Sequence, residues 1–309
     1  MILQQPTGSP SAPCFPQNTR NLRQKDRWGV RVFVCLGVFS SQPSFRMLNL
    51  DLTGKYALVA GSTRGIGRAA AHELAELGAT ITLMARDERL LNQVRAALPT
   101  PQGQQHDLLV ADFHQPDQVE ERVRKRVAEG AALHILVNNT GGPPGGALEE
   151  ADINDFLSAY RLHLLSNHLL MKNLTPGMKA YGYGRIVNVV STSVYEPIKG
   201  LGVSNTTRGA VASWAKTLSH ELAPHGITVN NVLPGATETD RLTGIIQNKM
   251  AKSGKTEDQV RADLLAAIPA GRFGQPEEVG GAIAFLCTPA AGYINGVSLA
   301  VDGGRLSSI

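Results

Sequence analysis

The stretch that decides the fold is Tyr56-Ala57-Leu58-Val59-Ala60-Gly61-Ser62-Thr63-Arg64-Gly65-Ile66-Gly67. Its apolar start, residues 56–60, predicts a strand, and apolar side chains at helical spacing predict a helix over 64–77 that opens in the turn. Glycines there allow a tight turn and let the backbone approach a pyrophosphate, which sits on the free N–H groups of the helix. A dinucleotide site is therefore expected at Gly61, Ser62, Thr63, Arg64, Gly65, Ile66 and Gly67.

Beyond this turn, strand and helix patterns alternate along the chain. Further strands are expected at 80–84, 108–111, 133–138, 185–190, 227–233 and 297–301, and helices at 87–98, 116–129, 152–178, 203–222 and 277–286. The polar segment 236–268 is expected to be mobile. Apolar strands separated by helices favour a parallel sheet covered on both faces. The sequence thus predicts a single α/β domain with a Rossmann-type, doubly wound parallel sheet and its ligand at the carboxyl ends of the strands.

Composition sets the broad class. The chain has 309 residues, 42% of them hydrophobic, enough for one large domain. Cys14, Cys35 and Cys287 are scattered, with no metal-binding spacing. We therefore expect neither a metal site nor a disulfide framework, and a cytoplasmic location.

The first 46 residues differ from the rest in composition. They hold six basic residues and one acidic residue, so the net charge of +4 leaves −1 on the remaining chain. We expect residues 1–46 to be an unstructured leader, an upstream extension before a start at Met47, with a signal or transit segment as the alternative. The apolar run 30–39 is too short to span a bilayer. Neither nucleic acid nor membrane is expected as a partner of the domain at 47–309.

The chain from about Leu50 to Gly304 resembles the short-chain dehydrogenase/reductase family. Markers of that family appear in order: the glycine turn, Asp112, Asn138-Asn139-Thr140-Gly141, Ser191, Pro234-Gly235 and Val301-Asp302-Gly303-Gly304. The resemblance implies that Asp112 contacts adenine, Asn138 supports the central sheet, and Pro234-Gly235 borders the nicotinamide. It implies a small carbonyl or hydroxyl substrate, as in 3-oxoacyl-thioester reductases, and a homo-oligomer, a tetramer or dimer, built on the long helices and the last strand.

The choice of cofactor follows from the end of the second strand, Leu83-Met84-Ala85-Arg86. An NAD site needs a carboxylate there for the ribose 2′-hydroxyl, whereas a 2′-phosphate needs an arginine. Arg86 therefore favours NADP over NAD, and Arg64 offers a second charge. The alternative is that Arg86 is a solvated residue at a helix start.

The expected catalytic groups depart from the family. Aligned on the strand 184–191, the family's serine is Ser191, its Tyr-x-x-x-Lys becomes Ser204 and Arg208, and its asparagine becomes His163. A serine hydroxyl is a poor general acid, and an arginine does not titrate near neutral pH.

Two other groups are candidates for the missing proton donor. His163 titrates in the useful range, and Tyr195 carries the only phenol in its loop. The structural alternatives are a hydrogen-bonding helix residue and a residue that covers the pocket. Two functions stay open: an NADP-dependent oxidoreductase with an altered proton donor, or an NADP-binding sensor or partner subunit without turnover.

Overall fold

The computed structural model describes residues 48–308 except 131 and 144, and the expected leader lies outside them. Seven parallel strands form one sheet in the order β3-β2-β1-β4-β5-β6-β7. The strands are β1 (Tyr56–Ala60), β2 (Thr80–Ala85), β3 (Asp107–Val110), β4 (Ile135–Asn138), β5 (Gly184–Val189), β6 (Ile227–Pro234) and β7 (Ser298–Val301).

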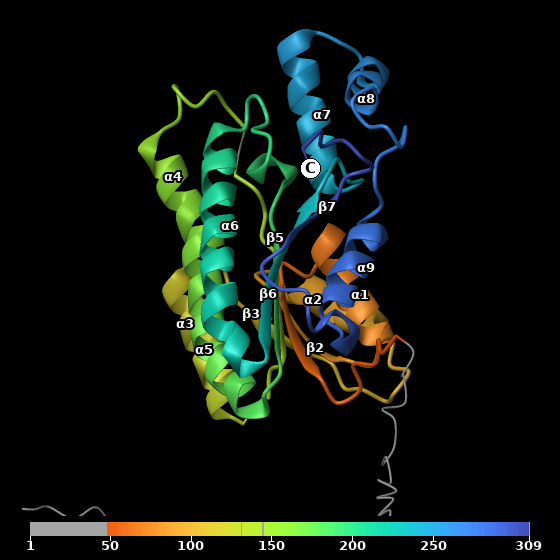
Figure 1. Cartoon of the computed structure of the whole chain (residues 1–309). Helices are drawn as coiled ribbons and strands as arrows, with labels where there is room; N and C mark the ends of the chain where they lie inside the picture. The colour runs from red at the N-terminus through yellow and green to blue at the C-terminus, as the bar shows by residue number, and fades with distance from the viewer. Residues whose placement is uncertain (1–47, 131, 144, 309) are drawn as a thin grey trace, which may run out of the picture. The chain divides into compact units, whose positions relative to one another are not determined.

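Helices cover both faces of this sheet (Figure 1). On one face lie α3 (Pro116–Ala128), α4 (Ile153–Tyr160), α5 (Ser166–Tyr181) and α6 (Gly202–Leu222), and on the other α1 (Gly65–Glu76), α2 (Glu88–Ala97) and α9 (Pro276–Leu286). Two further helices, α7 (Asp240–Ser253) and α8 (Glu257–Leu265), lie beyond the carboxyl ends of the strands. Short 3-10 turns occupy Thr192–Val194, Ala223–His225 and Pro289–Ala291.

The strand order reverses between β1 and β4, where the chain crosses from one half of the sheet to the other. Both strands are buried on both faces because each face has its own apolar layer: Ala57 and Val59 belong to the layer under α1 and α9, and Leu58 to the layer under α3 and α5. The predicted single-domain Rossmann-type fold is confirmed. The crevice at this reversal is where such sheets bind ligands.

The long helix expected at 152–178 is interrupted. A π-helical turn, Arg161–Leu165, separates α4 from α5, with the Ser166 N–H donating to the Arg161 carbonyl. Ser166 is fully buried, and its Oγ donates to the same carbonyl at 2.8 Å and to the Phe113 carbonyl at 3.1 Å. The Ser166 hydroxyl thus bonds to the Arg161 carbonyl, which in a regular α-helix would accept from the N–H four residues later.

The segment 236–268, expected to be a mobile polar stretch, contains α7 and α8. Leu242, Ile246 and Val260 from these helices pack on Ile268 and Phe273 in a small apolar cluster of their own. The burial of these side chains explains why the segment is helical. The signal in the sequence is the spacing of Leu242 and Ile246, four residues apart on one helix face. Within the described residues, no helix combines the length and apolar character needed to cross a membrane.

Candidate active site

The glycine turn is closed against the loop that follows β4. Gly61 has φ +58°, and a Cβ there would stand 2.4 Å from the Asn139 carbonyl oxygen. A Cβ on Gly67 would stand 2.3 Å from the Gly61 carbonyl oxygen. Asn139 Nδ2 donates to the Gly61 carbonyl at 3.1 Å and so holds the turn from outside. Any side chain at Gly61 or Gly67 would break this cradle.

The first turn of α1 leaves its N–H groups open. Arg64 is the N-cap residue but makes no side-chain cap, and the turn Gly65-Ile66-Gly67 has no acidic residue. Helix N–H groups without a capping side chain, together with the positive end of the helix dipole, attract an anion. Ser62 Oγ accepts from the Met84 N–H at 3.0 Å, which ties Ser62-Thr63 to β2.

Arg64 is engaged elsewhere. Its Nη1 lies 2.9 Å from Asp240 Oδ2 at the start of α7, and both side chains are exposed. Gly65 contacts α7 as well, since a Cβ there would meet the Thr239 methyl at 3.1 Å. An exposed pair of this kind stabilises little, but it places α7 over the glycine turn.

Arg86 and Asp112 end neighbouring strands, β2 and β3. Arg86 is exposed. Burial by itself raises the pKa of Asp112, but hydrogen bonds from His114 and the charges of His114 and Arg86 lower it below its ordinary value. A carboxylate and a guanidinium are thereby presented together beside β1, where an adenosine would extend from the glycine turn.

Asn138 begins a ladder of amides across four strands. Its Nδ2 donates to Asn188 Oδ1 at 2.8 Å, Asn188 Nδ2 to Asn231 Oδ1 at 3.0 Å, and Asn231 Nδ2 to Ser298 Oγ at 3.0 Å. These residues are in register along β4, β5, β6 and β7. The ladder fixes the carboxyl half of the sheet, on which the catalytic loops rest.

His163 lies inside the π turn and is 1% exposed. Its Nδ1 is 2.6 Å from Thr140 Oγ1, and its Nε2 has no hydrogen-bond partner. Burial lowers the pKa of His163 well below its usual value, and the charges of Arg208, Arg241 and His114 lower it further. The imidazole is therefore neutral at pH 7, oriented by Thr140, with one free nitrogen.

Ser204 and Arg208 are both buried on α6, one helical turn apart. Arg208 Nη1 donates to the Val189 carbonyl at the end of β5, at 2.8 Å. Ser191, two residues later, caps the following 3-10 turn, because its Oγ accepts from the Ser193 N–H at 3.1 Å. The structure thus brings Arg208, Ser191 and His163 to one end of the sheet.

Tyr195 lies apart from that group. Its side chain is half exposed, and its hydroxyl donates to the Ser298 carbonyl of β7 at 3.3 Å. The C-terminal residues hold the same loop: Arg305 Nη1 donates to Thr192 Oγ1 at 3.3 Å. Tyr195 therefore supports the loop after Ser191, and its covering role over the pocket stays a prediction.

Pro234-Gly235 closes the site at the end of β6. The Gly235 N–H donates to the Val301 carbonyl at 2.9 Å, and a Cβ on Gly235 would stand 2.7 Å from Asp302 Cα. Gly141, by contrast, has no protein atom within 4 Å of an added Cβ.

Two residues of this site were missed from the sequence. Thr140 occupies the variable position of Asn-Asn-x-Gly, and Arg241 lies in the segment expected to be mobile. Arg241 donates to the carbonyls of Gly142 at 3.4 Å and Pro143 at 2.8 Å. Only the fold brings Arg241 to the loop after β4, so no local pattern could have found it.

Comparison with known proteins agrees with this geometry. Residues 60–305 match the protein family described as enoyl-(acyl carrier protein) reductase. The chain belongs to the short-chain dehydrogenase/reductase family. The 3-oxoacyl-(acyl-carrier-protein) reductase FabG of Vibrio cholerae is 33% identical over 257 residues, which cover 82% of this chain and 98% of that protein. The expected oxidoreductase class is confirmed.

Two further members of the short-chain family are similar. The NADPH-dependent reductase BacG of Bacillus subtilis is 26% identical over 84% of this chain and all of that protein. The structure of L-sorbose reductase from Gluconobacter frateurii, in complex with NADPH and L-sorbose, superposes with a TM-score of 0.79 at 29% identity, over 84% of this chain and all of that one. The first is named as NADPH-dependent and the second was solved with NADPH, the phosphorylated cofactor that Arg86 favours.

The residues present fit such a cofactor. The cradle at Gly61 and Gly67 and the uncapped N–H groups of α1 suit a pyrophosphate, and exposed Arg86 suits a 2′-phosphate. No carboxylate stands at the end of β2 before Asp87, whose side chain caps α2 by accepting from the Leu90 N–H.

Proposed function

We propose that this protein is an NADP(H)-dependent reductase or dehydrogenase of a small carbonyl or hydroxyl compound, with His163 in the proton-transferring role. The observation that carries the proposal is the buried Thr140–His163 pair with its free Nε2, beside a complete cofactor cradle. When bound, NADPH supplies a hydride from its nicotinamide ring. Ser191 offers a hydroxyl group to polarise the carbonyl.

His163 takes the place of the absent phenol because its ring is held in position, although burial lowers its pKa below the ordinary range. Thr140 fixes the ring, so Nε2 holds or moves the proton at the substrate oxygen. Arg208 stays protonated and binds hydroxyl or anionic groups without titrating, even though burial and the charge of Arg241 lower its pKa to about 10. Gly61, Gly65, Gly67, Arg86 and Asp112 hold the cofactor, with Asn138, Asn139, Pro234 and Gly235 shaping its site.

NADPH oxidation with a panel of ketones and diketones tests this function. His163→Ala is expected to lower kcat by roughly 10²-fold, the scale of general acid catalysis, and to leave the Kd for NADPH within about threefold. Tyr195→Phe serves as the matched control, because its hydroxyl bonds to a carbonyl of β7. Full activity in His163→Ala would refute the assignment of the donor. Tight NADPH binding without turnover on the whole panel would refute the enzyme.

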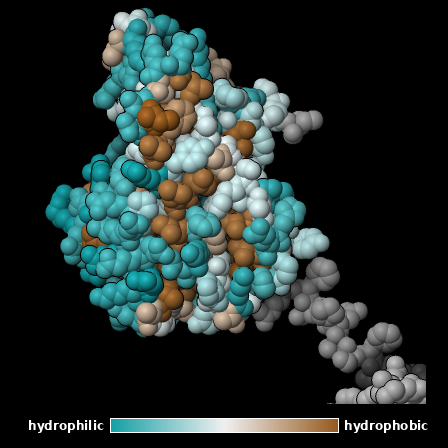
Figure 2. All heavy atoms as spheres, turned by 90° about the vertical axis from the view of Figure 1, so that its left-hand side faces the viewer, coloured by the Kyte–Doolittle hydropathy of each residue, from teal (hydrophilic) through white to brown (hydrophobic). Residues whose placement is uncertain are grey.

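We also propose a homo-oligomer in the cytoplasm and a folded domain at 47–309. Figure 2 shows apolar side chains in a band across the face formed by α3, α4, α5 and α6. Residues 1–46 are proposed to take no part in the domain, because the described fold holds its whole sheet from Tyr56 onward. Expression of residues 47–309 alone with an unchanged melting temperature is the expected result, and a clearly lower one would contradict it.

A further inference from the structure

Two guanidinium groups are held at the loops around His163. Arg208 comes from α6 and is buried, and Arg241 comes from the first turn of α7 and is exposed. Both donate to main-chain carbonyls, Arg208 to Val189 and Arg241 to Gly142 and Pro143. Among the described residues, neither has a carboxylate within ion-pair distance.

Their charges act on one another and on the imidazole. Burial lowers the pKa of Arg208 to about 10, with the charge of Arg241 as the second cause. Burial is also the main cause of the lowered pKa of His163, followed by Arg208 and Arg241. The cluster therefore holds two cations and a neutral imidazole with a free nitrogen, and no facing acid. A buried cation without a counterion is costly, and an anion that reached it would be strongly held.

We propose that Arg241 and Arg208 bind a carboxylate of the substrate, so that the enzyme acts on an oxo acid whose carboxylate lies beside the reacting carbonyl. This inference rests on the proposed function and names its substrate class. Guanidinium groups match the planar carboxylate with paired hydrogen bonds. Arg208, at the position of the family's lysine, and Arg241, in a segment without a family-wide pattern, give this chain a charge arrangement of its own.

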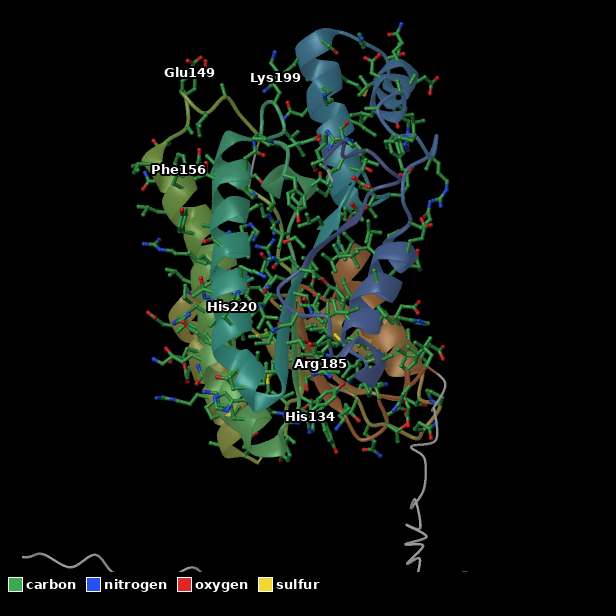
Figure 3. The ribbon with its side chains drawn as sticks, viewed as in Figure 1. His134, Glu149, Phe156, Arg185, Lys199 and His220 are labelled. Atoms are coloured by element: carbon green, nitrogen blue, oxygen red, sulfur yellow. The ribbon has the colours of Figure 1, made fainter. Side chains whose placement is uncertain are left out.

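A groove lined in part by the segment that follows the loop after β4 carries a net positive charge. The loop that receives Arg241 continues to Ala147, Leu148 and Glu149, which line an open groove with Lys199, Gly200 and Lys252. Figure 3 shows Glu149 and Lys199 on neighbouring loops at the upper end of the molecule. Two lysines against one glutamate leave the groove net positive, which favours the approach of an anion.

A bound carboxylate also completes the chemistry. Its negative charge offsets the positive charges of Arg208 and Arg241, which are the lesser causes of the lowered pKa of His163 after burial. The reaction is then balanced: the oxo acid takes a hydride at its carbonyl carbon and a proton at its carbonyl oxygen, giving a hydroxy acid and NADP+.

Binding of oxamate, an unreactive analogue of a 2-oxo acid, to the NADPH-saturated protein tests the inference without turnover. Oxamide, its neutral counterpart, and inorganic phosphate are titrated alongside by calorimetry in chloride-free buffer. Oxamate is expected to bind at least about tenfold more tightly than oxamide, because charge-assisted hydrogen bonds are about twice as strong as neutral ones, and phosphate is expected to bind no more tightly than oxamate. Arg241→Gln and Arg208→Gln are each expected to weaken oxamate binding about tenfold.

The controls distinguish failure of the carboxylate site from failure of the proposed NADP(H)-dependent reductase function. Arg124→Gln, an exposed arginine of α3, is expected to leave oxamate binding unchanged. Equal binding of oxamate and oxamide, no oxamate binding, tighter phosphate binding, or loss of NADPH rather than oxamate in Arg241→Gln would each overturn the carboxylate site. Reduction of neutral diketones with no preference for oxo acids would contradict the carboxylate site but support the proposed reductase function. Oxamate binding without turnover of any carbonyl would support the carboxylate site but contradict the proposed reductase function.

Discussion

Arg86, a single exposed side chain at the end of β2, is the residue proposed to set the choice between the two nicotinamide cofactors. Arg86→Asp removes the partner of a 2′-phosphate and places a like charge there. We expect the preference for NADPH over NADH to fall by about 1–3 kcal/mol, or roughly 5- to 150-fold. Titration of both cofactors measures it, with Arg89→Asp on the exposed face of α2 as control. Unchanged NADPH affinity would mean that Arg86 only faces solvent.

His163 makes stability depend on pH at the residue scale. The folded chain holds it neutral, so below pH about 6.5 the unfolded chain binds the additional proton. Its contribution is complete above that pH and is lost as pH falls, by up to about 1.4 kcal/mol per pH unit. His134, whose pKa burial also lowers, acts with the same sign.

Urea unfolding at pH 7.5 and 5.5 checks this dependence. His163→Gln is expected to show a smaller loss of stability between the two than the wild type does. His220→Gln, an exposed position on α6, should keep the wild-type loss (Figure 3). An identical loss in all three proteins would mean that His163 is solvated in the folded state.

At the scale of elements, the amide ladder joins β4 through β7. Asn188 is fully buried and bonds on both sides, so Asn188→Ala leaves the amide of Asn138 and the carbonyl oxygen of Asn231 without partners. We expect a loss of roughly 2–4 kcal/mol in the free energy of unfolding. Thr228→Val is the matched control in β6, because the Thr228 hydroxyl is buried without a partner and its removal should cost almost nothing. Equal effects of the two changes would show that the ladder is incidental.

Most elements could be predicted because their signals are local. The apolar run Tyr56–Ala60 and the glycines after it set β1, the turn and α1 within one or two residues. The π turn could not be predicted, because Arg161–Leu165 has an ordinary helical pattern and the bond from the buried Ser166 hydroxyl to the Arg161 carbonyl is visible only in the structure. Arg241 and Thr140 reach the site through contacts between residues distant in sequence. The family motifs therefore located the expected site positions but did not indicate these two residues.

For the whole molecule, the apolar face of the helical layer is the feature to test. Ile153, Leu157 and Leu165 are 69%, 49% and 46% exposed on α4 and the π turn. Apolar side chains gathered on one face mark an interaction surface, and a second copy is the commonest partner of such a face. Leu157→Lys is expected to shift the protein toward smaller assemblies in sedimentation velocity at a fixed concentration. Leu48→Lys, equally apolar and exposed outside the helices, should change nothing. A wild-type monomer would contradict the proposal.

The π turn amounts to one residue more than a continuous helix needs. Deleting one residue within 161–165 would restore regular α-helical pairing from α4 into α5, but would rotate one part against the other by about 100°. If the part that carries His163 rotates, the helix keeps its hydrogen bonds but the imidazole loses its orientation. If the other part rotates, the imidazole keeps its orientation but apolar side chains of that part turn outward. A change in chain length at this point therefore disturbs either the imidazole or the buried side chains, whereas the exposed loops beyond the sheet carry no such constraint.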